Sequence, residues 1–268
     1  MLFEDQLVVV RGGGDLASGV VAQLHHAGFP IVVLELERPL AVRRSVAFAS
    51  AVAEGRVTID GIAGERADTV DDALEIAESG SVAVLTNPGV PDFDRSIAIL
   101  VDGRMAKRNL GTNPGQASFV VALGPGFNAG VDCDAVVETA RGHRLGRVIW
   151  EGSAIPDTGV PGNVGGVTTD RLLRSPAGGR VEWSVEIGDS VAAKQVVGQV
   201  DGAPVEALIA GVVRGLIAPG SVVSAGTKIG DVDPRADRAA CFEISDKSRL
   251  VGAGVLEAVL VWLNQQAS

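Results

Sequence analysis

Short runs of apolar residues recur along the first half of the chain, and a turn or a polar residue follows each run. Leu7–Val10, Ile31–Leu34 and Val82–Leu85 consist entirely of Val, Leu, Ile and Ala. Runs without polar positions are typical of strands that are buried on both faces of a parallel sheet. Ile97–Val101 and Phe119–Leu123 are also continuously apolar. We predict that these runs are strands of one sheet.

Between the strands, the apolar residues change to helical spacing. Leu16–His26 has apolar residues three or four positions apart, and Gly28 closes this predicted helix. Thr69–Glu78 begins with a residue that can cap a helix and continues with acidic residues in its first turn. Leu40–Val52 and Leu250–Leu263 are predicted as further helices. Strands that alternate with helices indicate the α/β class.

A glycine-rich turn joins the first predicted strand to the first predicted helix. Gly12, Gly14 and Ala17 match the G-x-G-x-x-G/A pattern of dinucleotide-binding turns, with Gly13 and Asp15 between them. Such glycines let the backbone approach a phosphate, and the start of the helix offers N–H groups and a positive dipole end. We therefore predict a Rossmann-like parallel sheet with helices on both faces, which binds a phosphate-bearing cofactor at residues 12–17.

Three charged residues extend this predicted cofactor site. Glu35 lies 21 residues after Gly14, where a dinucleotide-binding fold places the acid that binds the ribose. An ordinary charge at a strand end is the alternative interpretation of Glu35. Arg43 and Arg44 stand near the start of the predicted helix Leu40–Val52 and can bind a 2′-phosphate or another polyanion. A solvated helix face accounts for these two arginines equally well.

Two later loops also follow apolar strands. Asn109, Gly111 and Thr112 belong to the loop after Ile97–Val101, and the stretch GPGFNAGVD follows Phe119–Leu123. Ligands of open α/β sheets bind outside the carboxyl ends of the strands. We therefore add Asn109, Gly111 and Thr112 to the predicted cofactor-binding residues and expect these loops to meet the glycine turn.

The next segment carries residue types that perform acid–base and thiol chemistry. Asp132, Cys133 and His143 are weak candidates for catalytic residues. A buried small apolar residue is the favoured interpretation of Cys133, whereas His143, with arginines nearby, can contact an anion or act as an acid or base. The histidines and cysteines lack the spacing of a metal site, so no metal is expected.

Composition and net charge limit the classes of partner that the protein is expected to bind. The chain has 268 residues and a formal net charge of −10, which argues against binding to nucleic acid or to an anionic membrane surface. Two cysteines provide no disulfide framework, and we find neither a signal-peptide pattern nor a membrane-spanning run. A cytoplasmic protein is the prediction, with homo-oligomers possible.

A repeat lies near the end of the chain. Ser175–Val200 aligns without gaps to Ala207–Val232, at an offset of 32 residues, and glycines and valines match throughout. The repeat resembles the biotinyl/lipoyl barrel-sandwich hybrid, a small all-β module. The hairpin Asp201–Ala207 between the halves has no lysine, so neither biotin nor lipoate is expected. We predict a Rossmann-like α/β domain over residues 1–172, this module over 173–235, and a strand and helix over 236–268 that return to the first domain.

Several stretches together resemble one protein family over nearly the full chain. The resemblance is to the accessory protein of the selenium-dependent molybdenum hydroxylase system. Where it leads us to expect a histidine after GPGF, this chain has Asp134. The stretches that carry the resemblance are RGGGDLASG, ELERPLAVRRSVAFASAV, AKRNLGT, LGPGFNAGVD, VVETARGHRLGRVIWEGSA, KIGDVDPR and the closing ISDKSRL with GAGVLEAVL.

The resemblance implies a role in maturation or cofactor supply. The expected ligand is a nucleotide, such as NAD(P), or a molybdopterin-type cofactor. The expected partner is a molybdenum hydroxylase or one of its maturation factors. The alternative is an NAD(P)-dependent oxidoreductase with His143 or Asp132 as proton donor, in which case Arg43 and Arg44 would favour NADP. The sequence shows no acid or base with an orienting partner, which a dehydrogenase needs, so the accessory role is preferred.

Overall fold

The computed structural model describes residues 1–159 and 162–267, and the chain falls into two compact units. The larger unit contains Met1–Pro39, Phe48–Thr158 and the chain from Ile244 onward. The smaller unit contains Leu40–Ala47 and Gly159–Glu243. The sequence-based boundaries lie after residues 172 and 235, whereas the units of the structure change at residues 158/159 and 243/244.

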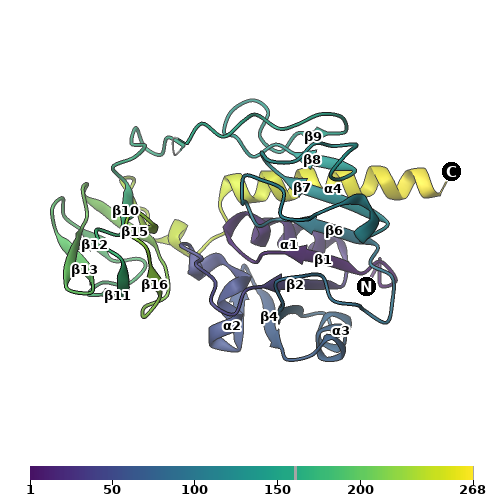
Figure 1. The fold of residues 1–268 in the computed structure, drawn as a ribbon, viewed down its shortest axis with the longest axis horizontal. Coiled ribbons are helices and arrows are strands. Elements are labelled where there is room, and N and C mark those ends of the chain that lie inside the picture. Colours follow the sequence, from purple (N-terminus) through teal and green to yellow (C-terminus); the bar gives the residue numbers. More distant parts are fainter. Residues whose placement is uncertain (160–161, 268) are drawn as a thin grey trace. The chain divides into compact units, whose positions relative to one another are not determined.

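The larger unit is built on a nine-stranded sheet with the order β3-β4-β5-β2-β1-β6-β7-β8-β9 (Figure 1). Neighbouring strands from β4 to β8 run parallel, whereas β3 and β9 are antiparallel to the strands beside them. Parallel neighbours end at the same edge of the sheet, so the last residues of β1 and β6, Arg11 and Asp102, are paired across the ladder. The strands are β1 (Val8–Arg11), β2 (Ile31–Glu35), β3 (Arg56–Ile59), β4 (Ile62–Ala67), β5 (Val82–Thr86), β6 (Ile99–Asp102), β7 (Phe119–Leu123), β8 (Ala135–Val137) and β9 (Val148–Ile149).

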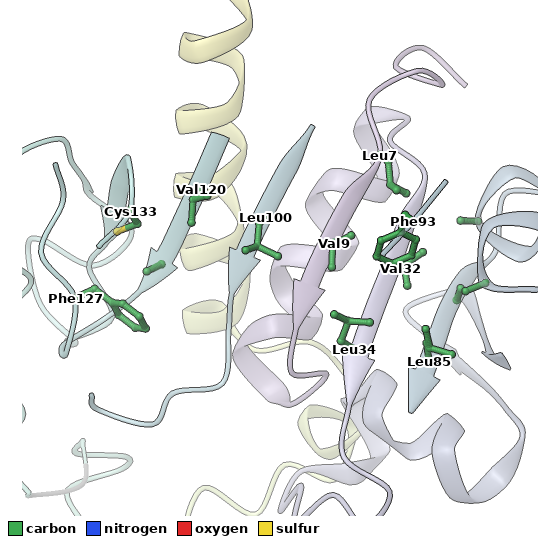
Figure 2. Close-up of a cluster of buried hydrophobic side chains, with 14 of the residues drawn as sticks. Leu7, Val9, Val32, Leu34, Leu85, Phe93, Leu100, Val120, Phe127 and Cys133 are labelled. Carbon is green, nitrogen blue, oxygen red and sulfur yellow. The ribbon is translucent and has the colours of Figure 1, made fainter. Parts of the chain in front are cut away.

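Helices cover the two faces of this sheet unequally. Helices α1 and α4 pack side by side on one face, and Figure 2 shows them behind the strands. On the opposite face, α3 is joined by loop residues, among them Phe93 and Phe127, in a cluster that includes Val9 and Leu100. The α-helices are α1 (Asp15–Ala27), α2 (Ala51–Glu54), α3 (Val70–Glu78) and α4 (Asp246–Gln266), and the short 3-10 helices are η1 (Arg44–Val46), η2 (Phe48–Ser50), η3 (Pro114–Gln116) and η4 (Ala239–Cys241).

The predicted fold class is wrong. In place of a Rossmann-like parallel sheet with helices on both faces and a barrel-sandwich hybrid module, the structure has a large mixed sheet and two small antiparallel sheets. Helices are few, because the connections from β5 to β6, from β6 to β7 and from β7 to β8 contain no α-helix. Glycine and proline in these connections, as in NPGVP and GPGFNAG, oppose helix formation, and apolar loop residues cover the sheet there instead.

Two local predictions also need correction. Leu40–Val52 is not one helix, because it contains η1, η2 and only the first residues of α2. The β3–β4 hairpin was not predicted, although its turn has the sequence Asp60–Gly61, which is a strong hairpin signal. Both turn residues have a positive φ, 47° for Asp60 and 82° for Gly61, as a turn of this kind requires. The alternating pattern around Asp-Gly was therefore sufficient to predict the hairpin.

The smaller unit holds two four-stranded antiparallel sheets, with the orders β10-β17-β15-β12 and β14-β13-β11-β16. The 32-residue offset of the repeat recurs in the strands, since β11, β12 and β13 begin 32 residues before β15, β16 and β17. Each sheet takes strands from both halves, so neither half can bury its apolar residues alone. The strands are β10 (Leu172–Arg174), β11 (Gly179–Trp183), β12 (Ser190–Val191), β13 (Val196–Val200), β14 (Ala203–Glu206), β15 (Gly211–Leu216), β16 (Val222–Val223) and β17 (Lys228–Asp233).

In the described part of the chain, no helix combines the length and the apolar character needed to cross a lipid bilayer.

Candidate functional site

The glycine turn leaves the end of β1 and leads into α1. Gly12 extends the ladder, because its N–H donates to the carbonyl of Leu34 at 2.7 Å. The N–H of Gly13 turns to the end of β2 and donates to Oε2 of Glu35, also at 2.7 Å. Gly14 is the N-cap of α1 and makes no side-chain capping bond. The turn therefore presents the start of a 13-residue helix at the carboxyl edge of the sheet.

The three glycines of the turn differ in what surrounds them. Gly12 has a φ of 89°, and a Cβ there would lie 3.2 Å from Cα of Arg104. A Cβ on Gly13 would lie 2.7 Å from the backbone nitrogen of Ala49. Gly14 has an ordinary φ of −73°, and a Cβ there would meet no described atom within 4 Å. The fold thus requires glycine at positions 12 and 13, whereas at position 14 it leaves open space.

Glu35 is held by the backbone around it. Its Oε2 accepts the N–H of Gly13, and its Oε1 accepts the N–H of Leu36, each at 2.7 Å. The carboxylate therefore fixes the glycine turn against the end of β2. This contact is a structural role for Glu35, and the sequence prediction of a ribose-binding role did not anticipate it.

A buried network of charged residues lies beside the turn, and sequence reasoning missed most of it. Arg104 donates to both oxygens of Asp102, at 3.1 and 2.5 Å, and Arg11 donates to Oγ1 of Thr112 at 2.7 Å. The Thr112 hydroxyl donates in turn to Oδ2 of Asp102 at 2.6 Å. Of these residues only Thr112 was predicted. The signal for Arg11 and Asp102 was present, because VVVR and ILVD are apolar strands that each end in a charge.

The network shifts the pKa values of its members. Burial alone would raise the pKa of Asp102, but hydrogen bonds from Arg104 and Thr112, with the charge of Arg104, hold that pKa below its ordinary value. Burial lowers the pKa of Arg11, as does the charge of Arg104, while Asp102 opposes the change. Arginine stays protonated in proteins, so Arg104 is paired directly with Asp102 and Arg11 reaches the same carboxylate through Thr112. Arg104 lies next to Gly12, and the carboxylates of Glu35 and Asp15 lie at the same turn and offset part of this positive charge.

The predicted loop residues form part of the same hydrogen-bonded chain. Asn109 accepts the N–H of Thr112 at 2.7 Å, and its amide donates to the Thr112 carbonyl and to Oδ1 of Asp132. Oδ2 of Asp132 accepts the N–H of Asn128 at 2.8 Å. Gly111 has a φ of 84°, as a tight loop requires. The loops after β6 and β7 are therefore joined to each other and, through Thr112, to the ends of β1 and β6.

The candidate catalytic residues do not form one constellation. Asp132 uses both oxygens in the contacts with Asn109 and Asn128. Cys133 is buried in the apolar cluster of Figure 2, and burial followed by the charges of Asp132 and Asp134 raises its pKa to about 12. His143 is exposed in the connection from β8 to β9. No acid–base pair therefore links these residues in the described chain.

Two other predicted binding residues of the larger unit contact the protein itself. Oδ1 of Asp15 accepts a hydrogen bond from the hydroxyl of Ser248, at the start of α4, at 2.7 Å. Ala17 is buried against Gly103, and a Cβ on Gly103 would lie 2.9 Å from the Ala17 methyl group. Ala17 therefore allows the segment after β6 to approach α1 closely.

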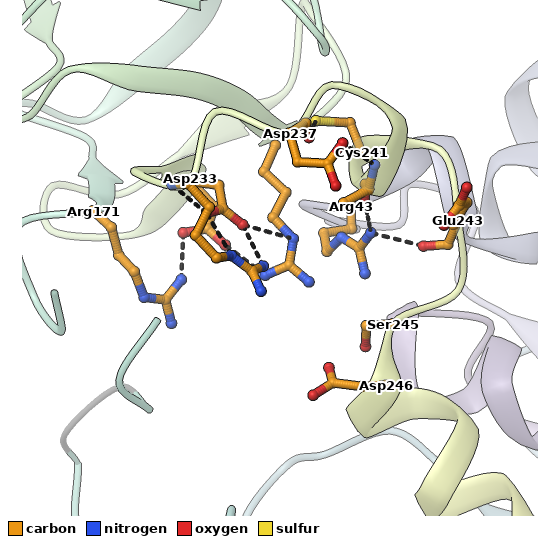
Figure 3. Close-up of polar contacts among 12 residues, drawn as sticks. Arg43, Arg171, Asp233, Asp237, Cys241, Glu243, Ser245 and Asp246 are labelled. Carbon is orange, nitrogen blue, oxygen red and sulfur yellow. Dashed lines mark hydrogen bonds and ion pairs between the residues drawn. The ribbon is translucent and has the colours of Figure 1, made fainter. Parts of the chain in front are cut away.

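Arg43 and Arg44 belong to the smaller unit, not to the unit that carries the glycine turn. Nη2 of Arg43 donates to the carbonyls of Ala240 and Glu243, at 2.9 and 3.0 Å (Figure 3). These bonds hold the 40–47 segment to the end of the smaller unit. The proposed phosphate-binding role of Arg43 thus has a structural alternative that the sequence did not reveal.

A groove opens next to Glu35, beyond the ends of β2 and β5. It has a volume of about 680 Å³. Among the described residues, no cluster of histidine, cysteine, aspartate and glutamate has the arrangement of a metal site. The groove is lined by Leu36, Glu37, Arg38, Val52, Arg66, Thr86 and Pro88.

Comparison with known sequences adds one relative. No protein-family model matches this chain. The chain is 45% identical over 261 residues to the uncharacterized protein YqeB of Escherichia coli (strain K12), in an alignment that covers 97% of this chain and 48% of that protein. The chain therefore spans about half the length of the curated relative that it matches.

Solved structures show only a weak likeness. An aspartoacylase family protein from Mesorhizobium loti is 12% identical with a TM-score of 0.29, covering 85% of both chains. The product-bound ectoine utilization protein EutE (DoeB) from Ruegeria pomeroyi is 16% identical with a TM-score of 0.23, covering 85% of this chain and 57% of that one. At these TM-scores the likeness assigns no function to this chain.

Proposed function

We propose that this chain binds a phosphate-bearing ligand, of the nucleotide or molybdopterin type, at Gly12–Gly14. We further propose that it serves as an accessory protein in the maturation of a selenium-dependent molybdenum hydroxylase. The partner would be that hydroxylase or one of its maturation factors, in the cytoplasm. The family resemblance in RGGGDLASG and the other stretches named above supports the accessory role.

Gly14 carries the ligand-binding part of the proposal. Steric crowding by Arg104 and Ala49 accounts for glycine at positions 12 and 13. At position 14 the backbone angles suit any residue, and a side chain would extend into open space in front of α1. A good capping residue such as serine or aspartate would stabilise the helix more than glycine does. Glycine here is therefore best explained by a ligand that approaches the backbone closely.

The surrounding charge favours an anionic ligand. At the edge where α1 begins, Arg104 pairs with Asp102, and Arg11 donates to Thr112, which donates in turn to Asp102. Both guanidinium groups are mostly buried, so solvent screens their charge less than it would at an open surface. A helix N-terminus and a local positive charge act together on a phosphate.

A holding role agrees with the contacts of the candidate catalytic residues. Asp132 accepts hydrogen bonds with both of its oxygens, and the raised pKa of Cys133 keeps its thiol protonated near neutral pH. Neither residue is arranged to move a proton to or from a ligand at Gly14. These contacts favour the accessory role over hydride transfer.

The binding part is tested with Gly14→Val. The purified protein would be examined by native mass spectrometry for co-purified ligand and titrated with ATP, GTP, NAD, NADP and a molybdopterin species. We expect one of these ligands to bind, and the variant to lose at least tenfold in affinity while its circular dichroism stays unchanged. Gly178→Val is the matched control, because Gly178 is exposed in the smaller unit and its Cβ would only contact the Val223 carbonyl, at 3.7 Å. Equal affinity of Gly14→Val and the parent protein would contradict the proposal.

The accessory role is tested in cells that contain the hydroxylase. Deleting this chain should leave the hydroxylase polypeptide present but without an active cofactor, and the parent gene should restore activity where Gly14→Val does not. Full hydroxylase activity in the deletion strain would rule out the accessory role without touching the ligand-binding result.

A further inference from the structure

The groove beside Glu35 indicates what the ligand carries beyond the phosphate proposed at Gly14. We propose that this groove binds a nucleoside and selects one that carries an additional phosphate on its ribose. This inference rests on the proposed function, because it places the first phosphate of the same ligand at Gly14. It goes further by assigning a chemical class to the ligand.

The groove lies close to the glycine turn. Glu35 and Thr86 are paired residues at the ends of β2 and β5. Glu35 binds the N–H of Gly13 on one side and the N–H of Leu36 on the other. Leu36 and Thr86 both line the groove. The Glu35 carboxylate therefore lies between Gly14, where we place the phosphate, and the groove that would hold the rest of the ligand.

The lining has apolar surfaces that suit a flat ring. Leu36 is exposed over 54% of its surface although it is a large apolar residue, and Pro88 is exposed as well. Val52 is almost fully buried and closes the groove from a different segment. Side chains of this kind contact the faces of a base without requiring hydrogen bonds. The volume of about 680 Å³ lies in the range of small-molecule sites.

The polar groups of the groove favour a phosphate over a free ribose diol. A diol is recognised by a carboxylate that accepts its hydroxyl groups, but both oxygens of Glu35 are bonded to the backbone. Arg38 has no hydrogen bond or ion pair with the rest of the described chain. Arg66 pairs with Asp68 at 3.3 Å, and its side chain is 48% exposed, so a phosphate can replace that partner at little cost.

Thr86 supplies a further hydrogen-bonding group. Its Oγ1 is buried and has no hydrogen-bond partner among the described residues. A buried hydroxyl without a partner is unfavourable unless a ligand or water satisfies it. Among the lining side chains Arg38 and Arg66 are cationic and Glu37 is acidic, and Asp68 pairs with Arg66 from outside the lining. Arg38, together with Arg66 once its exposed pair with Asp68 opens, supplies the positive charge for a second phosphate.

The test compares adenosine nucleotides that differ only in one phosphate. Isothermal titration of the whole chain would use 5′-AMP, adenosine 2′,5′-bisphosphate and adenosine 3′,5′-bisphosphate. We expect one bisphosphate to bind at least tenfold more tightly than 5′-AMP. Tighter binding of the 2′,5′ compound identifies an NADP-type ligand, and tighter binding of the 3′,5′ compound identifies a coenzyme A-type ligand.

Variants locate the effect in the groove. The double variant Arg38→Met with Arg66→Met should abolish the tenfold preference, so that the bisphosphate and 5′-AMP bind with affinities within twofold of each other. Arg56→Met is the matched control, since Arg56 is an exposed arginine of β3 that does not line the groove. A preference that survives in the double variant would overturn the inference.

The outcomes separate this inference from the proposed function. If 5′-AMP binds and Gly14→Val weakens it, but neither bisphosphate binds more tightly, the inference fails and the ligand-binding proposal stands. The same holds if only a ligand without adenosine binds at Gly14. If no phosphate ligand binds the parent protein, both fail.

Discussion

Two glycines of the smaller unit and Gly14 of the larger unit differ in what surrounds them. In the smaller unit, Gly198 lies where strands approach closely, since a Cβ there would overlap the Glu182 carbonyl and the Trp183 ring. Gly230, its counterpart in the repeat, is enclosed in the same way by Leu173 and by the Gly215 carbonyl. In the larger unit, Gly14 faces open space. Packing explains Gly198 and Gly230, and it leaves Gly14 to be explained by a ligand.

The units also bring charged residues together by different routes. In the larger unit, Arg11 and Asp102 end two parallel strands that are far apart in sequence, and they meet because both strands end at one edge. In the smaller unit, Asp231 and Asp233 lie on one strand, β17, and pair with arginines such as Arg171 and Arg235. Strand ends of a parallel sheet thus create a polar edge that can receive a ligand, whereas the pairs along β17 bind the smaller unit to itself.

The largest effect is expected at the polar edge. Asp102→Asn removes the carboxylate that pairs with Arg104 and whose charge acts on Arg11, and it leaves buried positive charge uncompensated. We expect it to lower the free energy of unfolding by about 3–5 kcal/mol at pH 7, measured by urea denaturation. Asp92→Asn is the control, because Asp92 is exposed and should change stability by less than about 0.5 kcal/mol.

The pH dependence of this difference has a definite sign. The pKa of Asp102 is lower in the folded protein than its ordinary value of about 4. Its contribution to stability is therefore fully present above about pH 4 and is lost as the pH falls through the folded pKa. The stability gap between the parent protein and Asp102→Asn should narrow in acid. A gap that is constant from pH 7 to pH 3 would show that the carboxylate charge is not responsible.

A smaller effect is expected from filling the close approach in the smaller unit. Gly198→Ala places a methyl group against the Glu182 carbonyl and the Trp183 ring, and the backbone must shift to accept it. Overpacking of this kind costs about 1–3 kcal/mol, which a urea titration would detect. Gly178→Ala should be nearly neutral, because its methyl group would only touch the Val223 carbonyl. Equal losses of stability in Gly198→Ala and Gly178→Ala would show that close packing does not explain the glycine at position 198.

Local sequence patterns predicted the positions of the strands, but they did not predict which residues cover the sheet. The apolar runs Leu7–Val10, Ile31–Leu34 and Val82–Leu85 each overlap a strand of the sheet, and Thr69 caps α3 by accepting the N–H of Asp72. The repeat offset located the strands of the smaller unit, because period-two segments and turn glycines are local signals. The predicted fold class was wrong because loop residues such as Phe93, and not helices, cover the sheet next to the connections after β5, β6 and β7. This tertiary arrangement leaves no periodic pattern in the sequence.

The candidate site was predicted in part for the same reason. The glycine turn directly follows β1, and Asn109–Thr112 belongs to the loop after β6, so both were expected near the carboxyl edge. The partners of these residues depend on strand order, which the sequence does not give, so the network of Arg11, Asp102 and Arg104 was missed. Arg43 illustrates the opposite error, because its nearness in sequence to Glu35 hides its contacts with Ala240 and Glu243, about 200 residues later.

The smallest expected effect is a difference in thiol reactivity between one cysteine of each unit. Cys133 and Cys241 are both free and buried. Burial raises the pKa of both thiols, to about 12 for Cys133, while Arg43 and Arg214 partly offset the rise at Cys241. At pH 8 only about one Cys133 thiol in ten thousand is a thiolate, the form that reacts. In the native protein Ellman's reagent should therefore modify Cys133 more slowly than Cys241, measured in the single-cysteine variants Cys241→Ser and Cys133→Ser. Unfolding in urea should remove the difference, and faster native reaction at Cys133 would restore it as a candidate catalytic thiol.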